Sequence, residues 1–78
     1  MTIDRGAPQF PFEQLAAILR GRIADGTYPA GRRIPPLTAL EAEFGVSSMT
    51  VRRAVAVLAE EGLLLRVRGR GTYVTPAR

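Results

Sequence analysis

The chain has 78 residues and a formal net charge of +4, and its 11 basic residues are all arginines because it contains no lysine. It also contains no cysteine and no histidine, which excludes disulfides, thiol nucleophiles, zinc sites of the usual type and histidine as a general base. It has no run of the roughly 20 apolar residues that a membrane span requires, and no signal-peptide pattern. We therefore expect one small, cytoplasmic, non-enzymatic binding module with no cofactor and no membrane partner.

The first ten residues show no hydrophobic periodicity, so we predict a flexible tail over residues 1–10. The domain covers residues 11–75, and residues 76–78 form a second tail. Within the domain, apolar residues recur at helical spacing over residues 12–25, which predicts a helix ended by the glycine that follows. Pro11 suits its first position, where no hydrogen bond is lost.

A turn and a very short strand at residues 33–34 precede a second predicted helix over residues 37–44, which Gly45 ends. Ser47 is a suitable N-cap for a third helix over residues 48–61, because its hydroxyl can accept a hydrogen bond from the first turn. Two helices joined by three residues have the dimensions of a helix-turn-helix, although other helical hairpins share this spacing.

The hydrophobic period changes after the third helix. Here successive residues alternate between two sets, which is the pattern of a β-strand. The first set is Leu63, Leu65 and Val67, and the second is Leu64, Arg66 and Arg68. The two glycines around Arg70 allow a tight reversal, because glycine tolerates positive φ, and residues 72–75 form the return strand. The expected fold class is mainly α with a small β-hairpin, a three-helix winged helix-turn-helix.

The positive charge lies in the second half of the chain. Residues 1–45 contain five arginines and five acidic residues, whereas residues 46–78 contain six arginines and two acidic residues. Such a one-sided distribution is typical of nucleic-acid-binding proteins. The exclusive use of arginine has a simpler explanation in a GC-rich genome, because the chain also has 11 alanines and no asparagine.

The predicted third helix has two different faces on a helical wheel. One is mainly apolar and is the expected core face: Thr50, Val51, Ala54, Val55 and Leu58. The opposite face is small, polar and basic, which suits insertion into the major groove of DNA: Ser48, Met49, Arg52, Arg53 and Ala56. The alternative is an ordinary solvated face, with Met49 folded into the core.

Arg52 is the first candidate for a base contact, because a guanidinium can bond guanine O6 and N7 together. Met49 suits a thymine methyl group, and Ser48 and Thr50 suit phosphate oxygens or base edges. Arg53 lies beside them on the exposed face and is a further candidate.

The predicted hairpin turn carries a second basic group, Arg66, Arg68 and Arg70, with no acidic residue nearby. The turn alone is compatible with an ordinary β-turn that has solubilising charges. After a helix-turn-helix it is typical of a wing, in which Arg70 reaches a minor groove or lies along phosphates. Affinity would then depend on salt through counterion release.

These residues resemble the N-terminal DNA-binding domain of GntR-type bacterial transcription regulators, most closely the HutC-like branch. The resemblance covers most of the chain and is strongest in three segments: Thr50-Val51-Arg52-Arg53-Ala54, Glu61-Gly62-Leu63-Leu64 and Gly69-Arg70-Gly71-Thr72-Tyr73-Val74. It implies a winged helix-turn-helix that binds double-stranded operator DNA as a dimer and acts as a repressor. It also implies DNA contacts by Thr50 and Arg52 and, at the wing tip, by Arg68, Gly69 and Arg70.

Two positions depart from the family. Thr38 replaces a common phosphate-binding arginine at the start of the second helix, and Ser48 replaces another common arginine. Each such contact is worth about 1–3 kcal/mol, so their loss predicts weaker binding. Thr38 is still counted among the candidate DNA-binding residues, because it occupies the phosphate-binding position.

Family members normally continue into a C-terminal domain that binds a small-molecule effector and forms the dimer. We therefore expect either an excised DNA-binding domain or a stand-alone regulator that dimerises weakly or only on DNA, without an effector site of its own. The alternatives are a winged-helix protein-interaction module and an RNA-binding domain. RNA binding is less favoured, because most of the few aromatic residues are placed as core and form no stacking platform.

Overall fold

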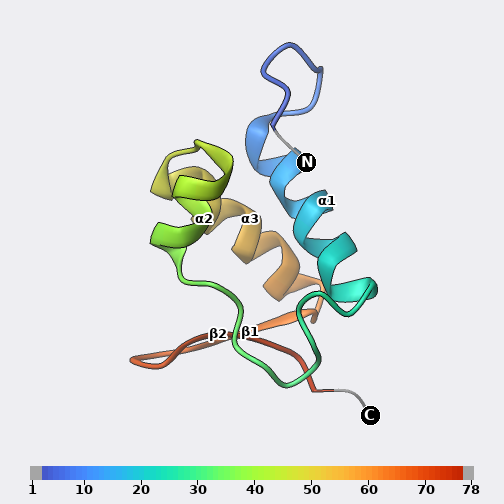
Figure 1. Cartoon of the computed structure of the whole chain (residues 1–78), viewed down its shortest axis with the longest axis vertical. Coiled ribbons are helices and arrows are strands. Elements are labelled where there is room, and N and C mark those ends of the chain that lie inside the picture. The colour runs from blue at the N-terminus through green and yellow to red at the C-terminus, as the bar shows by residue number, and fades with distance from the viewer. Residues whose placement is uncertain (1–2, 77–78) are drawn as a thin grey trace.

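The computed structural model describes residues 3–76, which form three helices followed by a two-stranded hairpin (Figure 1). The elements are α1 (Pro11–Ala24), α2 (Leu37–Phe44), α3 (Ser48–Glu60), β1 (Leu64–Val67) and β2 (Gly71–Val74). The predicted fold class, mainly α with a small β-hairpin, is confirmed.

Helix α1 begins with Pro11 at its first position, as predicted. The Glu13 carboxylate accepts a hydrogen bond of 2.9 Å from the Phe10 N–H, which satisfies a donor that the helix itself leaves unpaired. The apolar stripe of α1 packs against α3 and is buried: Leu15, Ala16, Ile18 and Leu19. This packing places α3 across the centre of the molecule.

The turn between α2 and α3 has the local geometry that the sequence predicts. Gly45 ends α2 with φ 63°, in the left-handed region that favours glycine. The Ser47 hydroxyl accepts a hydrogen bond of 3.2 Å from the Thr50 N–H, so the predicted N-cap of α3 is confirmed. Val46 is buried between them and holds the turn against the core.

Strands β1 and β2 pair antiparallel, and a third segment joins the other edge of β2. Arg33 forms an isolated bridge with Tyr73, and the Ile34 N–H donates to the Thr72 carbonyl at 2.9 Å. The short strand predicted at residues 33–34 is thus a single bridge. It fastens the base of the hairpin to the segment that leads into α2.

Only Leu64 among the residues of β1 is buried in the core, and Leu63 just before the strand is half-buried against it. Leu64 is 2% exposed and pairs with the buried Val74, whereas Leu65 and Val67 are 47% and 39% exposed. The physical reason is that the base of the hairpin lies over the core while the rest of the ribbon projects from the body (Figure 1). Apolar side chains farther along the ribbon therefore remain in solvent.

Residues 3–10, which belong to the predicted flexible tail, fold against the start of α1. The Gln14 side chain accepts from the Asp4 N–H and donates to the Asp4 carbonyl, both at 2.7 Å. Arg5 donates to the Gly45 carbonyl at 2.9 Å. These bonds tie the segment to the domain, and its flexibility stays a prediction. The first two and last two residues of the chain lie outside the described part.

The core consists of apolar side chains and Tyr28, whose hydroxyl accepts a hydrogen bond from Arg22. Its largest fully buried side chains come from all three helices and the first strand: Leu15, Leu19, Leu40, Val51, Leu58 and Leu64. Over residues 3–76 no charged side chain is buried, so the charged groups able to recognise a ligand lie at or near the surface. None of the described helices is long and apolar enough to cross a membrane.

Candidate nucleic-acid interface

The exposed face of α3 carries most of the predicted site residues. Ser48, Met49, Arg52 and Arg53 are all exposed, and the 63% exposure of Met49 excludes its alternative place in the core. Thr50 is half-buried, and its hydroxyl accepts a hydrogen bond from the Ser47 hydroxyl at 3.1 Å. The predicted core face of the helix is buried as expected: Val51, Ala54, Val55 and Leu58.

The two adjacent arginines of α3 have different surroundings. The Arg53 guanidinium lies over the Phe12 ring of α1, with its central carbon 4.1 Å from the ring centroid. This cation–π contact directs Arg53 towards the start of α1. Arg52 takes no part in the ion pairs or cation–π contacts formed within residues 3–76, and it is exposed. It therefore has the guanidinium that is most available for a ligand on this face.

The wing residues lie at the hairpin turn. Arg68, Gly69 and Arg70 are exposed, and the Arg70 N–H closes the turn by donating to the Val67 carbonyl at 3.0 Å. Gly69 has φ 76°, which an L-residue rarely adopts. The hairpin projects on the side of the molecule where α2 lies (Figure 1), so the tip carries two guanidiniums into solvent beside the helix-turn-helix.

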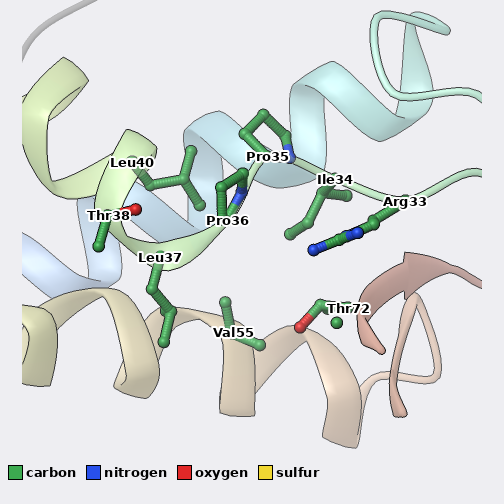
Figure 2. A pocket seen from close by; sticks show the side chains of 10 residues that line it. Arg33, Ile34, Pro35, Pro36, Leu37, Thr38, Leu40, Val55 and Thr72 are labelled. Atoms are coloured by element: carbon green, nitrogen blue, oxygen red, sulfur yellow. The ribbon is translucent and has the colours of Figure 1, made fainter. Parts of the chain in front are cut away.

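Thr38 is exposed in the first turn of α2. It lines a pocket of about 310 Å³ between the start of α2, α3 and the base of the hairpin (Figure 2). Arg33 and Thr72 line the same pocket. Arg33 was missed by sequence reasoning, because it belongs to the half of the chain whose charges balance and no motif singled it out.

Two arginines of α1 are held by carboxylates, in contrast to those of α3 and the wing. Arg20 Nε donates to Glu61 Oε1 at 2.9 Å. Arg22 donates to Glu43 Oε1 at 3.1 Å and to the Tyr28 hydroxyl at 2.7 Å. Hydrogen bonds from these guanidiniums hold the pKa of each carboxyl below its ordinary value.

The ion pairs also change where the positive charge lies. Glu61, one of the two acidic residues in the basic half of the chain, is neutralised by Arg20 from the balanced half. Between residues 3 and 76 no carboxylate forms an ion pair with an arginine of α3 or the hairpin. The guanidiniums of this surface without a carboxylate partner are Arg52, Arg53, Arg66, Arg68 and Arg70, and among them Arg53 contacts the Phe12 ring.

The sequence profile described as "Bacterial regulatory proteins, gntR family" matches residues 11–74. The chain belongs to this family. This GntR-family chain is 52% identical over 63 residues to an uncharacterised HTH-type transcriptional regulator of Rhizobium meliloti, covering 81% of this chain and 26% of that protein. It is 40% identical over 70 residues to the histidine utilization repressor of Klebsiella aerogenes, covering 90% and 29%. The resemblance to the GntR family and its HutC-like branch is confirmed.

Solved structures agree with this assignment. The fold is similar to that of the AraR DNA-binding domain in complex with operator ORX1, with a TM-score of 0.86 and 30% identity over 96% of this chain and 95% of that one. It is also similar to YtrA of Sulfolobus acidocaldarius, a GntR-family transcription factor, with a TM-score of 0.86, 28% identity and coverage of 97% and 80%. The architecture is a winged helix-turn-helix, with β1 and β2 as the wing.

Proposed function

We propose that this GntR-family domain binds double-stranded operator DNA in a sequence-specific manner and acts in transcription regulation as a repressor. The observation that carries the proposal is the distribution of free guanidiniums: those of α3 and the wing have no carboxylate partner, whereas Arg20 and Arg22 on α1 are paired. The similarity to a histidine utilization repressor and to a DNA-binding domain in complex with an operator supports it.

In this binding mode the N-terminal half of α3 enters the major groove. Arg52 contacts base edges, because it is exposed and unengaged. Met49 provides an exposed apolar surface for a thymine methyl group. Ser48 and Thr50, at the start of the helix, contact phosphates or base edges, and the Phe12 ring holds the guanidinium of Arg53 at the edge of this surface.

The wing makes the second contact. Arg68 and Arg70 lie in the minor groove or along its phosphates, and Gly69 allows the turn that brings both to the tip. Thr38, in the first turn of α2, contacts a phosphate through its hydroxyl. A hydroxyl is a weaker phosphate ligand than a guanidinium, so the remaining arginines carry more of the affinity.

The chain spans 26% to 31% of the length of the curated relatives that it matches. Several parts of the proposal therefore concern the whole protein: repression as the outcome, a homodimer that is weak or forms on DNA, and an effector site outside the described residues. A cytoplasmic location follows from binding bacterial DNA. The described surface acts by binding and has no catalytic role in this proposal.

The test is selection of bound duplexes from a random pool, followed by titration of the selected duplex and a scrambled duplex. We expect a selected half-site and binding roughly a thousandfold tighter than to the scrambled duplex. No enrichment, with equal binding to both duplexes, would refute sequence-specific recognition. Tighter binding to a hairpin RNA would favour an RNA-binding domain, and no binding to either nucleic acid would favour a protein-interaction module.

A further inference from the structure

The pocket beside Thr38 lies between the two proposed DNA contacts. It is bounded by the start of α2, by Val55 of α3 and by Thr72 at the base of the wing (Figure 2). Val55 is three residues after Arg52, and residues at this spacing are neighbours on a helix surface. The pocket is therefore about one helical turn from the proposed base-reading side chain.

Arg33 enters this pocket along a path that Gly71 makes possible. A Cβ atom at Gly71 would lie 2.7 Å from Arg33 Nε and 3.3 Å from Cζ. The guanidinium group thus passes directly over the glycine backbone, where any larger residue would displace it. Figure 2 shows the Arg33 side chain extending into the pocket, with Thr72 on the wing side and Thr38 on the α2 side. Gly71, whose φ of 125° favours glycine, therefore leaves free the space that the Arg33 side chain occupies beside the wing.

The charge of Arg33 is not compensated within the described part of the chain. The ion pairs there are formed by Arg20 and Arg22, and Arg33 is exposed. Its neighbours in the pocket include the hydroxyl-bearing side chains Thr38 and Thr72. A planar guanidinium offers several hydrogen-bond donors to the oxygens of one phosphate group.

The position of the pocket indicates which phosphate of the DNA Arg33 would contact. In DNA the sugar-phosphate backbone separates the major groove from the minor groove. If α3 lies in the major groove and the wing in the adjacent minor groove, the DNA backbone between these grooves passes over the protein surface between α3 and the wing. We infer that Arg33 binds a backbone phosphate at this crossing and supplies the guanidinium that Thr38 lacks. The inference rests on the proposed function and adds a contact to it.

The test compares Arg33→Gln with Arg32→Gln, an adjacent exposed arginine that does not line the pocket. Both variants lose one positive charge. Affinity for the selected and the scrambled duplex is measured at several salt concentrations. We expect Arg33→Gln to weaken binding to each of the two duplexes by the same factor, about tenfold. We also expect it to lower the slope of log K against log salt by about 0.9. We expect Arg32→Gln to change affinity severalfold less and to keep the slope.

A second variant tests the link to Thr38. If the two positions contact the same stretch of DNA backbone, Thr38→Arg in the Arg33→Gln background restores both the affinity and the salt slope. Failure to restore either quantity would overturn that link. Equal thermal unfolding of Arg33→Gln and Arg32→Gln confirms that both variants are folded.

The outcomes separate this inference from the proposed function. Wild-type protein that binds no duplex overturns the proposed function. Wild-type protein that binds DNA while Arg33→Gln behaves like Arg32→Gln overturns the Arg33 contact alone. An NMR shift with inorganic phosphate that depends on Arg33, together with unchanged DNA affinity, would also overturn it, because the pocket would then bind a free anion.

Discussion

Helix α1 and the surface made by α3 and the wing use arginine in opposite ways. On α1, Arg20 and Arg22 donate to carboxylates that are 41 and 21 residues distant in the sequence. On α3 and the wing, Arg52 and Arg70 are exposed and belong to no ion pair formed within residues 3–76. One group of guanidiniums joins parts of the domain, and the other is available to a polyanion.

The contrast shows that the positive charge available to a ligand depends on which arginines form ion pairs. Counting charged residues along the chain does not reveal this. Counting assigns Glu61 to the basic half, although it neutralises Arg20 of the balanced half. It also assigns Arg33 to the balanced half, although Arg33 forms none of the ion pairs in the described structure. Free charge therefore extends from α3 and the wing into the pocket beside α2.

The largest expected effect is on specific binding by Arg52→Ala. Loss of a bidentate base contact weakens binding to the selected duplex by about 1–3 kcal/mol, or roughly 5- to 150-fold, and weakens binding to a scrambled duplex less. Arg20→Ala is the matched control, because its guanidinium faces Glu61. Fluorescence anisotropy titrations measure both. Equal losses for the two variants would remove the distinction between the two surfaces.

The second prediction concerns the stability of the domain. Arg22 lies over the rings of Tyr28 and Phe44, at 5.6 Å and 5.0 Å from their centroids, and also bonds Glu43. Arg22→Ala should lower the free energy of unfolding by about 1–2 kcal/mol in urea titrations. Arg66→Ala, an exposed arginine of the wing, should change it by less than about 0.5 kcal/mol. A larger loss for Arg66→Ala would show that the wing arginines are structural.

The third prediction addresses the wing. Arg70→Ala should weaken binding to the selected duplex and to the scrambled duplex by the same few-fold factor. It should also reduce the slope of log K against log salt by about 0.9, because one phosphate contact is lost. Titrations at several salt concentrations measure the slope. An effect confined to the selected duplex would mean that Arg70 reads bases.

The smallest expected effect is on the pH dependence of stability. The Arg22 guanidinium lowers the pKa of the Glu43 carboxyl from its ordinary 4.5 in the folded state. The unfolded chain therefore binds this proton more readily, so the stabilisation is complete above about pH 4.5 and is lost as the pH falls through the lowered pKa. Thermal melts should show a shallower loss of stability below pH 4.5 for Glu43→Gln than for wild type. Parallel curves would contradict this.

The sequence predicted the features that depend on local rules. Gly45 and Ser47 specify the end of α2 and the start of α3 through backbone conformation and capping. The periodicity of α3 separated buried Val51 from exposed Arg52. These properties are set within a few residues, and the structure has them where the sequence placed them.

Features that depend on distant neighbours could not be predicted. The buried face of β1 is that of Leu64, because only the base of the hairpin reaches the core. The position of Arg53 depends on Phe12 of another helix, and that of Arg33 on the space at Gly71. No local pattern encodes these contacts.

The most direct test of the claim that unpaired guanidiniums form the DNA interface is an NMR titration of the arginine Nε–Hε signals with the selected duplex. The chain has 11 arginines and no lysine, so these signals report nearly all of its positive charge. We predict large shifts for Arg52, Arg68 and Arg70 and little change for Arg20 and Arg22. Equal or larger shifts for the two arginines of α1 would contradict the claim.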